Sequence, residues 1–409
     1  MTSPAPTAFA QYPVQALMHV ATRPPAMFTH GQGSWLHDSE GRRYLDLVQG
    51  WAVNSLGHAP AVIAQALAAQ SARLLQAGPG FYNDRAVALA ERLAALSGLE
   101  RSFFTSSGAE ANEGAIKLAR KFGQVHRGGA FEIITFESAF HGRTLATMSA
   151  SGKPGFDTMF RPQVPGFPKA RLNDLASVRA LIGAQTVAVM LEPIQGEAGV
   201  IEAEASFLRE LRALCDEHGL LLIFDEVQTG VGRTGALWGW QASGVKPDVM
   251  TLGKGLGGGV PVGALLAREA VCCFVPGDQG GTYTGNPLMC AVALAVLETV
   301  AAHGFLAGVQ AQGERLRGGL QAIAQRLGSA PAATSVTGRG LLLALDLPGR
   351  DAAALAETLR QRASTDGRRP GLLVNPVRAQ RLRLIPALNI TADEVDGALA
   401  MLGEALAAD

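Results

Sequence analysis

Leu220-Leu-Leu-Ile-Phe-Asp225 is the stretch that decides the fold, because five consecutive apolar residues end on a carboxylate. An uninterrupted apolar run of this length is typical of a strand that is buried on both faces, since a strand with one wet face alternates apolar and polar residues. In an open sheet of parallel strands, ligands bind beyond the carboxyl ends of the strands. The position of Asp225 therefore predicts a functional carboxylate at the edge of a buried sheet.

A carboxylate at that position needs a partner, because burying an unpaired charge is costly. For Asp225 the partner could be a backbone donor, a metal ion or a protonated heterocycle. A metal is the weakest of the three, because no cluster of His, Asp and Glu surrounds Asp225 at ligand spacing, and we expect no metal site. Gln228, three residues further on, offers an amide group at the same edge.

Other apolar runs of the same kind alternate with helix-like segments. The runs at 131–136, 186–191 and 262–267 are predicted to be buried strands. The segments 109–122 and 207–218 place their apolar residues at helical spacing. Strands that alternate with helices predict an α/β fold with a mostly parallel sheet.

The pattern changes towards both ends of the chain. A long helix is predicted at 286–303, followed by a helix at 309–327, a strand at 338–346 and a short strand at 381–385. Two short strands are predicted near the N-terminus, around 34–37 and 43–48. We expect a large domain at 61–305 and a smaller α+β domain at 306–409, to which residues 1–60 contribute.

The amino-acid composition limits which classes of partner are expected for the protein. Among 409 residues, 35 Lys and Arg balance 35 Asp and Glu, and neither a basic stripe nor a polybasic cluster is present, so we expect neither nucleic acid nor a membrane as partner. The four cysteines have no CxxC spacing, which indicates reduced thiols. With no signal-peptide pattern and no long apolar span, a cytoplasmic protein is expected.

Lys254 stands in the stretch Thr251-Leu-Gly-Lys-Gly-Leu-Gly-Gly-Gly259. Glycines on both sides indicate a place where the backbone passes close to other atoms. A desolvated lysine there can lose its proton and form a Schiff base with a carbonyl compound. On this stretch alone, an ordinary glycine-rich surface loop is as good an interpretation.

The same glycines formally match the dinucleotide fingerprint G-x-G-x-x-G between Gly253 and Gly258. That fingerprint requires a helix directly after the turn. Here Val260-Pro-Val-Gly263 follows and favours another strand, so we reject a dinucleotide site.

Two segments are candidates for binding a phosphate. Ser106-Ser-Gly-Ala-Glu110 begins a predicted helix, where free backbone N–H groups and the helix dipole favour an anion, and Ser107 adds a hydroxyl. A plain serine cap is the alternative for this segment. Thr282-Tyr-Thr-Gly-Asn-Pro287 precedes the long helix and is a second candidate, again with a plain cap as alternative. A reactive lysine, an anion site and a carboxylate are what pyridoxal phosphate requires of a protein.

Longer motifs now point to a family. They include Ser107-Gly-Ala-Glu-Ala-Asn-Glu113, Phe140-His-Gly-Arg-Thr144, Glu192-Pro-Ile-Gln-Gly-Glu197 and Leu222-Ile-Phe-Asp-Glu-Val-Gln-Thr-Gly-Val-Gly-Arg-Thr-Gly235. With these motifs the chain resembles the class III pyridoxal-phosphate aminotransferases, and most closely their acetylornithine branch. The resemblance implies the fold type I architecture of such transferases and a homodimer whose active sites lie at the subunit interface.

The resemblance also implies roles for individual residues. Lys254 is expected to form the Schiff base with pyridoxal phosphate and then to move a proton. Asp225 is expected to pair with the pyridine nitrogen, and Gln228 to approach the phenolic oxygen. The remaining expected contacts are Ser107, Gly108, Ala109 and Thr282 of the partner subunit at the phosphate, with Phe140 and Val227 on the two faces of the ring.

Substrate choice is expected to depend on Arg143, Glu197 and Arg383. By the resemblance, Arg143 binds the α-carboxylate of an ω-amine substrate, and Glu197 covers Arg383 until glutamate or 2-oxoglutarate needs it. The expected reaction moves the distal amine of N-acetylornithine to 2-oxoglutarate, as in arginine biosynthesis. Succinylornithine, succinyldiaminopimelate, ornithine and 4-aminobutyrate remain alternative substrates, and a decarboxylating or non-catalytic relative is a further alternative. The bulky Trp51 and the run Gln76-Ala-Gly-Pro-Gly-Phe-Tyr-Asn83 depart from the pattern of the branch near the expected entrance.

Overall fold

The computed structural model describes residues 12, 14–326 and 336–408. Its centre is a seven-stranded sheet in the order β4-β12-β11-β10-β7-β5-β6. All neighbouring strands are parallel except β12, which runs antiparallel to both β4 and β11. The mostly parallel sheet predicted from the sequence is therefore confirmed. The strands are β4 (Arg101–Thr105), β5 (Glu132–Phe136), β6 (Lys169–Ala170), β7 (Thr186–Leu191), β10 (Leu221–Asp225), β11 (Val249–Leu252) and β12 (Gly263–Ala267).

Both faces of this sheet are covered by helices, which explains the uninterrupted apolar runs. Helix α4 (Gly108–His126) packs on one face and α7 (Ala205–His218) on the other. In β10, Leu221 and Ile223 belong to the apolar cluster of α4, whereas Leu222 and Phe224 belong to that of α7. Side chains alternate along a strand, so Asp225 is the next residue on the α4 side. This register brings its carboxylate to the helix that begins with the predicted phosphate site.

Three further helices pack together, and one of them, α3 (Asp84–Ser97), contacts β4 of the sheet. Helix α8 (Pro287–Ala301) confirms the helix predicted at 286–303, and it packs against α2 (Ala61–Ser71) and α3. No single described helix is long and apolar enough to cross a membrane. Within the described part of the chain, α8 and α9 (Phe305–Arg326) taken together have the length and composition, but they are bent by 70° at their junction.

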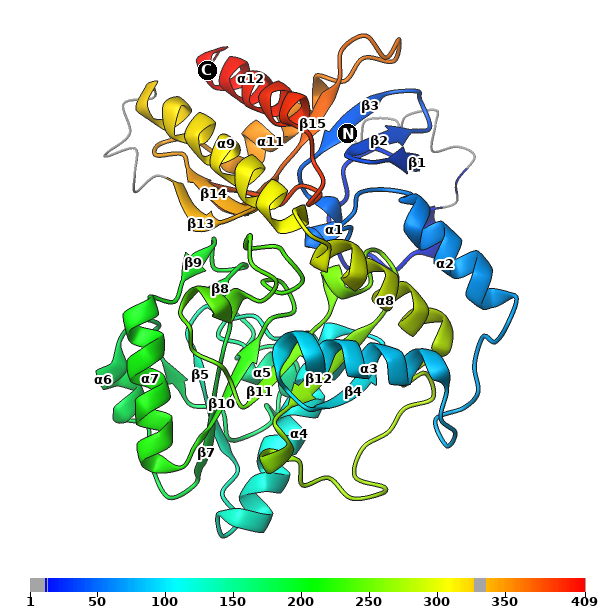
Figure 1. The fold of residues 1–409 in the computed structure, drawn as a ribbon. Coiled ribbons are helices and arrows are strands. Elements are labelled where there is room, and N and C mark those ends of the chain that lie inside the picture. Colours follow the sequence, from blue (N-terminus) through cyan, green and yellow to red (C-terminus); the bar gives the residue numbers. More distant parts are fainter. Residues whose placement is uncertain (1–11, 13, 327–335, 409) are drawn as a thin grey trace.

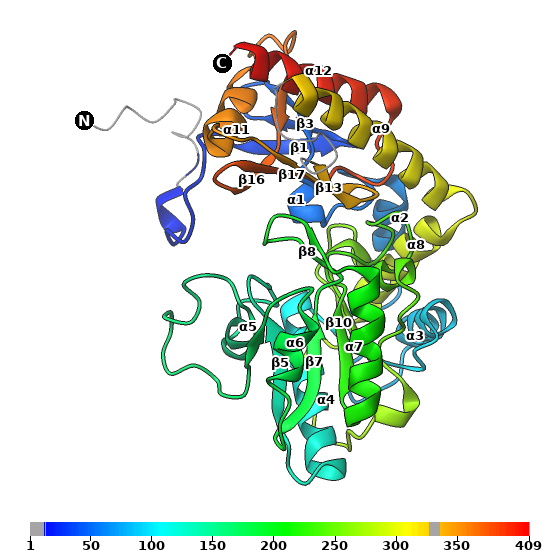
Figure 2. The same cartoon turned by 90° about the vertical axis from the view of Figure 1, so that its left-hand side faces the viewer.

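Two smaller sheets form a second group with α9, α11 (Ala352–Gln361) and α12 (Ala392–Ala408) (Figures 1 and 2). In the first, β1 (Phe28–Gln32), β2 (Trp35–Asp38) and β3 (Arg43–Asp46) continue to β15 (Gly371–Leu373), which pairs in parallel with β3. The second has the order β13-β14-β17-β16, with β13 (Val336–Arg339), β14 (Leu342–Asp346), β16 (Asn375–Arg378) and β17 (Arg381–Leu384). Residues from both ends of the chain therefore share one sheet.

The single strand predicted at 338–346 is wrong, because this segment is part of a hairpin formed by β13 and β14. Gly340 makes the turn with a φ of 55°, which favours glycine. A Cβ atom at this residue would also lie 2.4 Å from the carbonyl carbon of Thr234. The apolar run lies in β14, of which four residues are buried, whereas Val336-Thr-Gly-Arg339 of β13 is only partly buried and has no such run.

The segment α1 (Gln49–Ala52) winds in the left-handed sense. Gln49, Gly50, Trp51 and Ala52 all have φ between 47° and 65°, a conformation that costs a non-glycine residue roughly 1–2 kcal/mol. The Asp46 carboxylate stabilises the turn by accepting hydrogen bonds from the backbone N–H groups of Val48 and Gln49. The turn carries the half-exposed ring of Trp51 into a cavity of about 520 Å³ that Lys254 also lines.

The remaining described elements are short: η2 (Val14–Ala16), α5 (Leu145–Ala150), α6 (Leu175–Arg179), β8 (Ile194–Gln195), β9 (Ile201–Glu202), η3 (Gly239–Ala242), η4 (Lys254–Leu256) and η5 (Glu269–Val271).

Candidate active site

Lys254 begins the short turn η4, directly after β11. Its side chain lines a cavity of about 320 Å³ and makes no hydrogen bond or ion pair with another described residue. Burial lowers the pKa of Lys254 below that of an exposed lysine, and the positive charge of Arg383 lowers it further. A desolvated lysine without a partner can lose its proton and act as a nucleophile. The other residues around this cavity are Gly108, Ala109, Asn112, Phe140, His141, Gly142, Arg143, Glu192, Glu197, Asp225, Val227 and Gln228.

The glycines around Lys254 lie where the backbone passes close to other atoms, as predicted. A Cβ atom on Gly253 would lie 3.0 Å from Gly108 Cα, and one on Gly257 would lie 2.1 Å from the carbonyl oxygen of Val260. Strand β12 follows η4, so no helix follows the glycines as a dinucleotide fingerprint requires.

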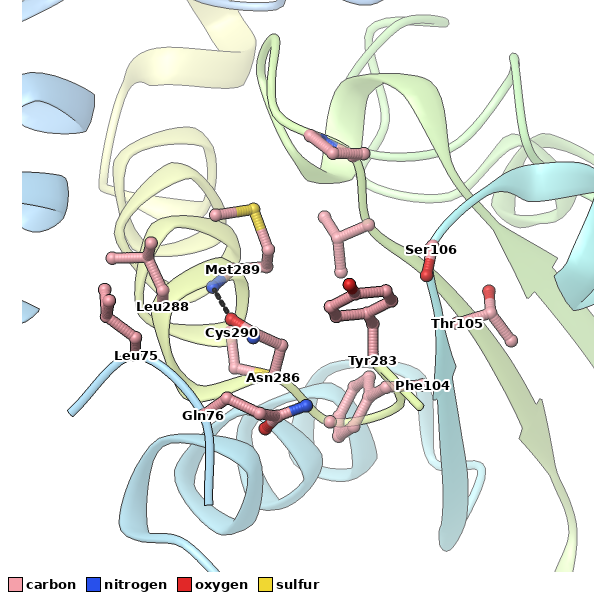
Figure 3. Close-up of a pocket in the computed structure, with 13 residues that line it drawn as sticks. Leu75, Gln76, Phe104, Thr105, Ser106, Tyr283, Asn286, Leu288, Met289 and Cys290 are labelled. Atoms are coloured by element: carbon pink, nitrogen blue, oxygen red, sulfur yellow. Dashed lines mark hydrogen bonds between the residues drawn. The ribbon is translucent and has the colours of Figure 1, made fainter. Parts of the chain in front are cut away.

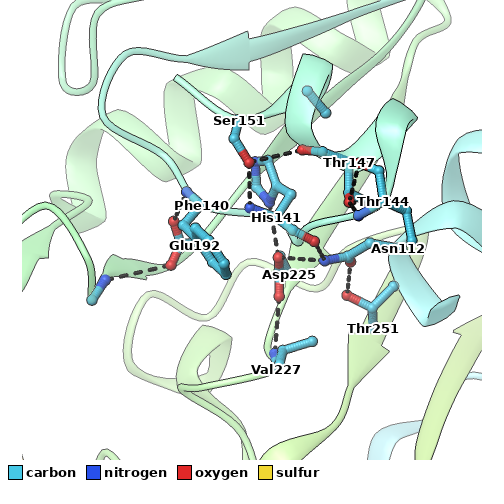
Figure 4. A network of polar contacts seen from close by, with 12 residues as sticks. Asn112, Phe140, His141, Thr144, Thr147, Ser151, Glu192, Asp225, Val227 and Thr251 are labelled. Carbon is cyan, nitrogen blue, oxygen red and sulfur yellow. Dashed lines mark hydrogen bonds and ion pairs between the residues drawn. The ribbon is translucent and has the colours of Figure 1, made fainter. Parts of the chain in front are cut away.

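Asp225 is held at the end of β10 by donors from three sides (Figure 4). Its Oδ2 accepts a hydrogen bond from Asn112 Nδ2 at 2.8 Å and lies 2.8 Å from His141 Nδ1, while its Oδ1 accepts from the backbone N–H of Val227. His141 is fixed in turn, because its backbone N–H donates to Ser151 Oγ. The carboxylate is therefore fixed in one orientation at the wall of the cavity. Among the described residues, no group of three or more His, Cys, Asp or Glu is placed to hold a metal ion.

Gln228 carries a donor without a partner. Its Nε2 is buried and makes no hydrogen bond in the described structure, whereas its Oε1 accepts from Arg383 Nη1 at 3.2 Å. A Cβ atom on Gly196 would lie 1.8 Å from that Oε1, so a side chain at this position would displace the amide. A buried donor without a partner is costly, and an acceptor oxygen on a bound molecule would satisfy it.

The start of α4 contributes backbone groups to the same cavity. Ser107 caps the helix, since its Oγ accepts the N–H of Glu110, and Gly108 and Ala109 line the cavity. A Cβ atom on Gly108 would lie 2.6 Å from Val227 Cγ1, so glycine is required there too. The serine cap is present, and the free N–H groups of the first turn remain available to an anion.

Thr282 does not line this cavity. Together with Ser106 it lines a different cavity, of about 290 Å³, and its carbonyl oxygen accepts a hydrogen bond from Gln76 Nε2. Within a single chain, the structure therefore does not bring Thr282 to Lys254.

Two arginines differ in how they meet the cavity. Arg383 on β17 is fully buried, and its guanidinium donates to Glu197 Oε1 at 2.8 Å and to Asn375 Oδ1 at 3.0 Å. Burial alone would raise the pKa of Glu197, but the charge of Arg383 and its hydrogen bond hold that pKa below its usual value. Arg143 is exposed and has no carboxylate partner among the described residues; its guanidinium carbon lies 5.6 Å from the centre of the Phe156 ring.

Glu192 is a residue of the cavity that the sequence analysis did not single out. Burial raises the pKa of its carboxyl to about 8, and the charge of Asp225 adds to this effect. Its two oxygens accept the backbone N–H groups of Phe140 and Gly196, at 2.9 and 3.4 Å. Glu192 thus ties the segment of Phe140 to the segment that carries Glu197. Its place at the start of Glu192-Pro-Ile-Gln-Gly-Glu197 was the available signal in the sequence. Asn112 and His141 likewise lie inside the family motifs 107–113 and 140–144.

These groups fit an anionic pyridine aldehyde. The lysine has no partner, a helix begins with free N–H groups, a fixed carboxylate stands across from them, and the Gln228 amide has an unused donor. Pyridoxal phosphate supplies a ring that withdraws electrons from a bound amine.

The chain matches the family model described as aminotransferase class-III over residues 17–406. It therefore belongs to the class III aminotransferases, and it is a pyridoxal-phosphate-dependent transaminase of the fold type I architecture. Among curated relatives, it is 56% identical to acetylornithine aminotransferase 2 of Bordetella bronchiseptica, over 98% of this chain and 99% of that protein. It is 55% identical to the acetylornithine aminotransferase of Ralstonia nicotianae, over 97% and 98% of the two chains.

Solved structures give the same family. The N-acetylornithine aminotransferase of Stenotrophomonas maltophilia matches with a TM-score of 0.82 and 36% identity, covering 97% of this chain and 98% of the other. The ornithine aminotransferase of Toxoplasma gondii matches with a TM-score of 0.88 and 30% identity, covering 97% and 93%.

Proposed function

We propose that this enzyme moves the distal amino group of N-acetylornithine to 2-oxoglutarate, giving the semialdehyde and glutamate. The observation that carries the proposal is the pair of arginines around Lys254. Arg143 offers a free cation to the cavity, whereas Arg383 is paired with Glu197. Curated relatives at 55–56% identity named acetylornithine aminotransferase support this choice.

The two substrates need different arginines in this proposal. A guanidinium binds a carboxylate through two parallel hydrogen bonds. With N-acetylornithine, Arg143 takes the α-carboxylate while Glu197 keeps Arg383 occupied, so the distal amine would reach the cofactor held at Lys254. With glutamate or 2-oxoglutarate, Arg383 leaves Glu197 and binds the α-carboxylate, and Arg143 takes the distal one.

The protein's other groups hold the cofactor and move the proton. Lys254 is assigned to the cofactor aldehyde and to proton transfer at the substrate carbon. Asp225 would keep the ring nitrogen protonated, and the Nε2 of Gln228 would donate to the phenolic oxygen. Phe140 and Val227 cover the faces of the ring, and the phosphate is assigned to Ser107, Gly108, Ala109 and Thr282 of the partner subunit.

A homodimer belongs to the proposal, because the phosphate site within one chain lacks Thr282. The apolar side chains that would face a second copy surround a cavity of about 460 Å³ (Figure 3), where Tyr283 comes from the segment of Thr282 and Leu288 and Met289 come from α8. Tyr82 and Phe81 are exposed at 98% and 76%, which is unusual for large apolar side chains. We further propose residues 61–305 as the large domain, residues 1–60 with 306–409 as the small one, and a cytoplasmic location.

The proposal is tested with a panel of amine donors and Arg143→Ala. Wild-type enzyme should give the highest kcat/KM with N-acetylornithine among the acylated and free diamines. Arg143→Ala should raise KM about a hundredfold for N-acetylornithine, and far less for 1,4-diaminobutane, which has no carboxylate. Arg143→Lys should lie between the two, because it keeps the charge without the paired geometry.

Equal losses for both donors would remove Arg143 from the proposed role. A higher kcat/KM with succinylornithine, succinyldiaminopimelate, ornithine or 4-aminobutyrate would replace N-acetylornithine as the proposed substrate, with the same reaction retained.

A further inference from the structure

Glu197 is shared by two cations in the structure. Its Oε1 lies 2.8 Å from Arg383 Nη2, and its Oε2 lies 3.4 Å from Lys153 Nζ. Arg383 is fully buried and has further hydrogen bonds to Asn375 and Gln228. Lys153 is half-buried, and Glu197 is its only carboxylate partner among the described residues.

The departure of Arg383 creates an electrostatic problem. The Glu197 side chain is only 24% exposed, so water solvates its carboxylate poorly once the guanidinium has left. An unpaired charge in such a place is costly, and that cost would oppose the binding of glutamate. The carboxylate therefore needs a second cation.

Lys153 is placed to be that cation. Its backbone is fixed by the preceding residue, since Gly152 exchanges backbone hydrogen bonds with Ser138 and Ala139. A Cβ atom on Gly152 would lie 2.2 Å from the carbonyl oxygen of Phe136, so this approach requires glycine. The flexible stem can bring the ammonium from 3.4 Å to full hydrogen-bond distance by a small rotation.

The ion pair between Glu197 and Arg383 acts as a gate, which is open when Arg383 has left Glu197. We propose that Lys153 is the counter-cation of this gate and holds the Glu197 carboxylate while Arg383 binds the α-carboxylate of glutamate or 2-oxoglutarate. The inference rests on the proposed function, because it assumes that Arg383 leaves Glu197 in one half-reaction. Lys153 stabilises both states of the gate. It contributes more to the open state, where Glu197 has no other cation, and only such a difference shifts the equilibrium.

A different role for Lys153 has to be weighed. Lys153 and Arg143 both lie near the rings of Phe140 and Phe156 and line the same cavity, so Lys153 could bind a substrate carboxylate directly. The ion pair decides between the roles, because Lys153 already has Glu197 as partner whereas Arg143 has no carboxylate. Direct binding is an outcome of the test below.

The test compares the two half-reactions of the holoenzyme in Lys153→Met. Methionine keeps the apolar stem over the two rings and removes the charge. Rapid mixing with a single amine donor, followed through the cofactor absorbance, should show kcat/KM for glutamate reduced about tenfold and that for N-acetylornithine changed less than about twofold. Binding of glutarate, which cannot react, should weaken by a similar factor in calorimetry. Lys153→Arg should retain both values.

Two further variants separate this role from a structural one. In the background of Glu197→Gln, Lys153→Met should have no additional effect on the glutamate half-reaction, because the negative charge that Lys153 would neutralise is absent. Lys121 forms a matched ion pair with Asp278, with side-chain exposures of 29% and 24% against 32% and 24% for Lys153 and Glu197. Lys121→Met should leave the ratio of the two half-reactions unchanged.

The outcomes are distinct. A loss confined to N-acetylornithine would mean that Lys153 binds that substrate directly, and equal or absent losses would mean that it does not act on the gate; either result overturns the inference. Failure of the proposed function would give a different result. Either the wild-type enzyme would not use N-acetylornithine, or the glutamate half-reaction would be unimpaired in an Arg383→Met variant.

Discussion

Two buried lysines show what makes one of them reactive. Burial lowers the pKa of Lys169 to about 7, and burial is also the largest cause that lowers the pKa of Lys254. Lys169 donates to Thr135 Oγ1 and to the carbonyl oxygens of Ser149 and Ala150, all within 2.8 Å. Lys254 has no such partner and faces a cavity. Loss of the proton therefore costs Lys169 one of its three hydrogen bonds, whereas Lys254 loses none.

This contrast predicts where the cofactor attaches. Borohydride reduction of the holoenzyme, followed by peptide mass spectrometry, should find the pyridoxyl group on Lys254 and not on Lys169. Lys254→Ala should lose that label and its turnover, with an unchanged far-ultraviolet circular dichroism spectrum. Turnover that persists in Lys254→Ala, or a label on Lys169, would contradict the assignment.

At this scale the sequence pointed to Lys254 and Asp225, and the structure places both at one cavity. Lys254 stands between glycines and Asp225 ends an apolar run, and both signals are local. Glu192 was signalled only by its place at the start of a family motif and Lys153 by no local pattern, because the environment of both residues depends on which loops the fold brings together. The raised pKa of Glu192 comes first from burial, which no spacing along the chain reveals.

Among the elements, the left-handed turn α1 carries a conformational cost at the mouth of the cavity. Gly50→Ala should lower the free energy of unfolding by about 1 kcal/mol, measured by urea denaturation, because its φ of 60° disfavours a side chain. Crowding does not contribute, since the added Cβ would meet its nearest neighbours at 3.6 Å.

The same substitution at Gly318 provides the control. Gly318 is exposed within α9, without a positive φ and with open space around its Cβ position. Alanine there should raise the free energy of unfolding by about 1 kcal/mol, because it favours the helix. The same sign at both positions would show that the backbone of α1 carries no such cost.

The sequence predicted elements well where burial sets the pattern. Strand β7 matches the predicted 186–191 residue for residue, since every one of its side chains is buried. The hairpin of β13 and β14 was missed, because Val336-Thr-Gly-Arg339 of β13 has no apolar run that would mark it as a strand, and because the turn at Gly340 depends on contact with Thr234, more than a hundred residues away. The left-handed sense of α1 was not predicted either. Left-handed backbone is expected mainly of glycine, and three of the four residues of α1 are not glycine.

For the whole molecule, the decisive prediction concerns which subunit provides Thr282. A hybrid dimer of one Lys254→Ala subunit and one Thr282→Asp subunit should have about half of the wild-type activity. One of its sites then combines an intact Lys254 with an intact Thr282 of the partner subunit. The aspartate repels the cofactor phosphate only in the other site.

The two parent variants, each as a pure dimer, should be inactive, and sedimentation should give twice the mass of one chain for each. If Thr282 acted within its own chain, both sites of the hybrid would be defective and no activity would return. Differently tagged subunits allow the hybrid to be isolated before assay.

The pairing of β3 with β15 also constrains how the protein can be made. Residues 43–46 leave the ribosome early, but the strand that completes their sheet is 371–373. At about 5–20 residues per second, the nascent chain waits on the order of tens of seconds with that sheet edge unpaired. The intervening residues include the whole seven-stranded sheet. A newly made chain can therefore build its cofactor pocket before the sheet that joins its two ends exists, and until then the open edge of β3 has to be kept away from other chains.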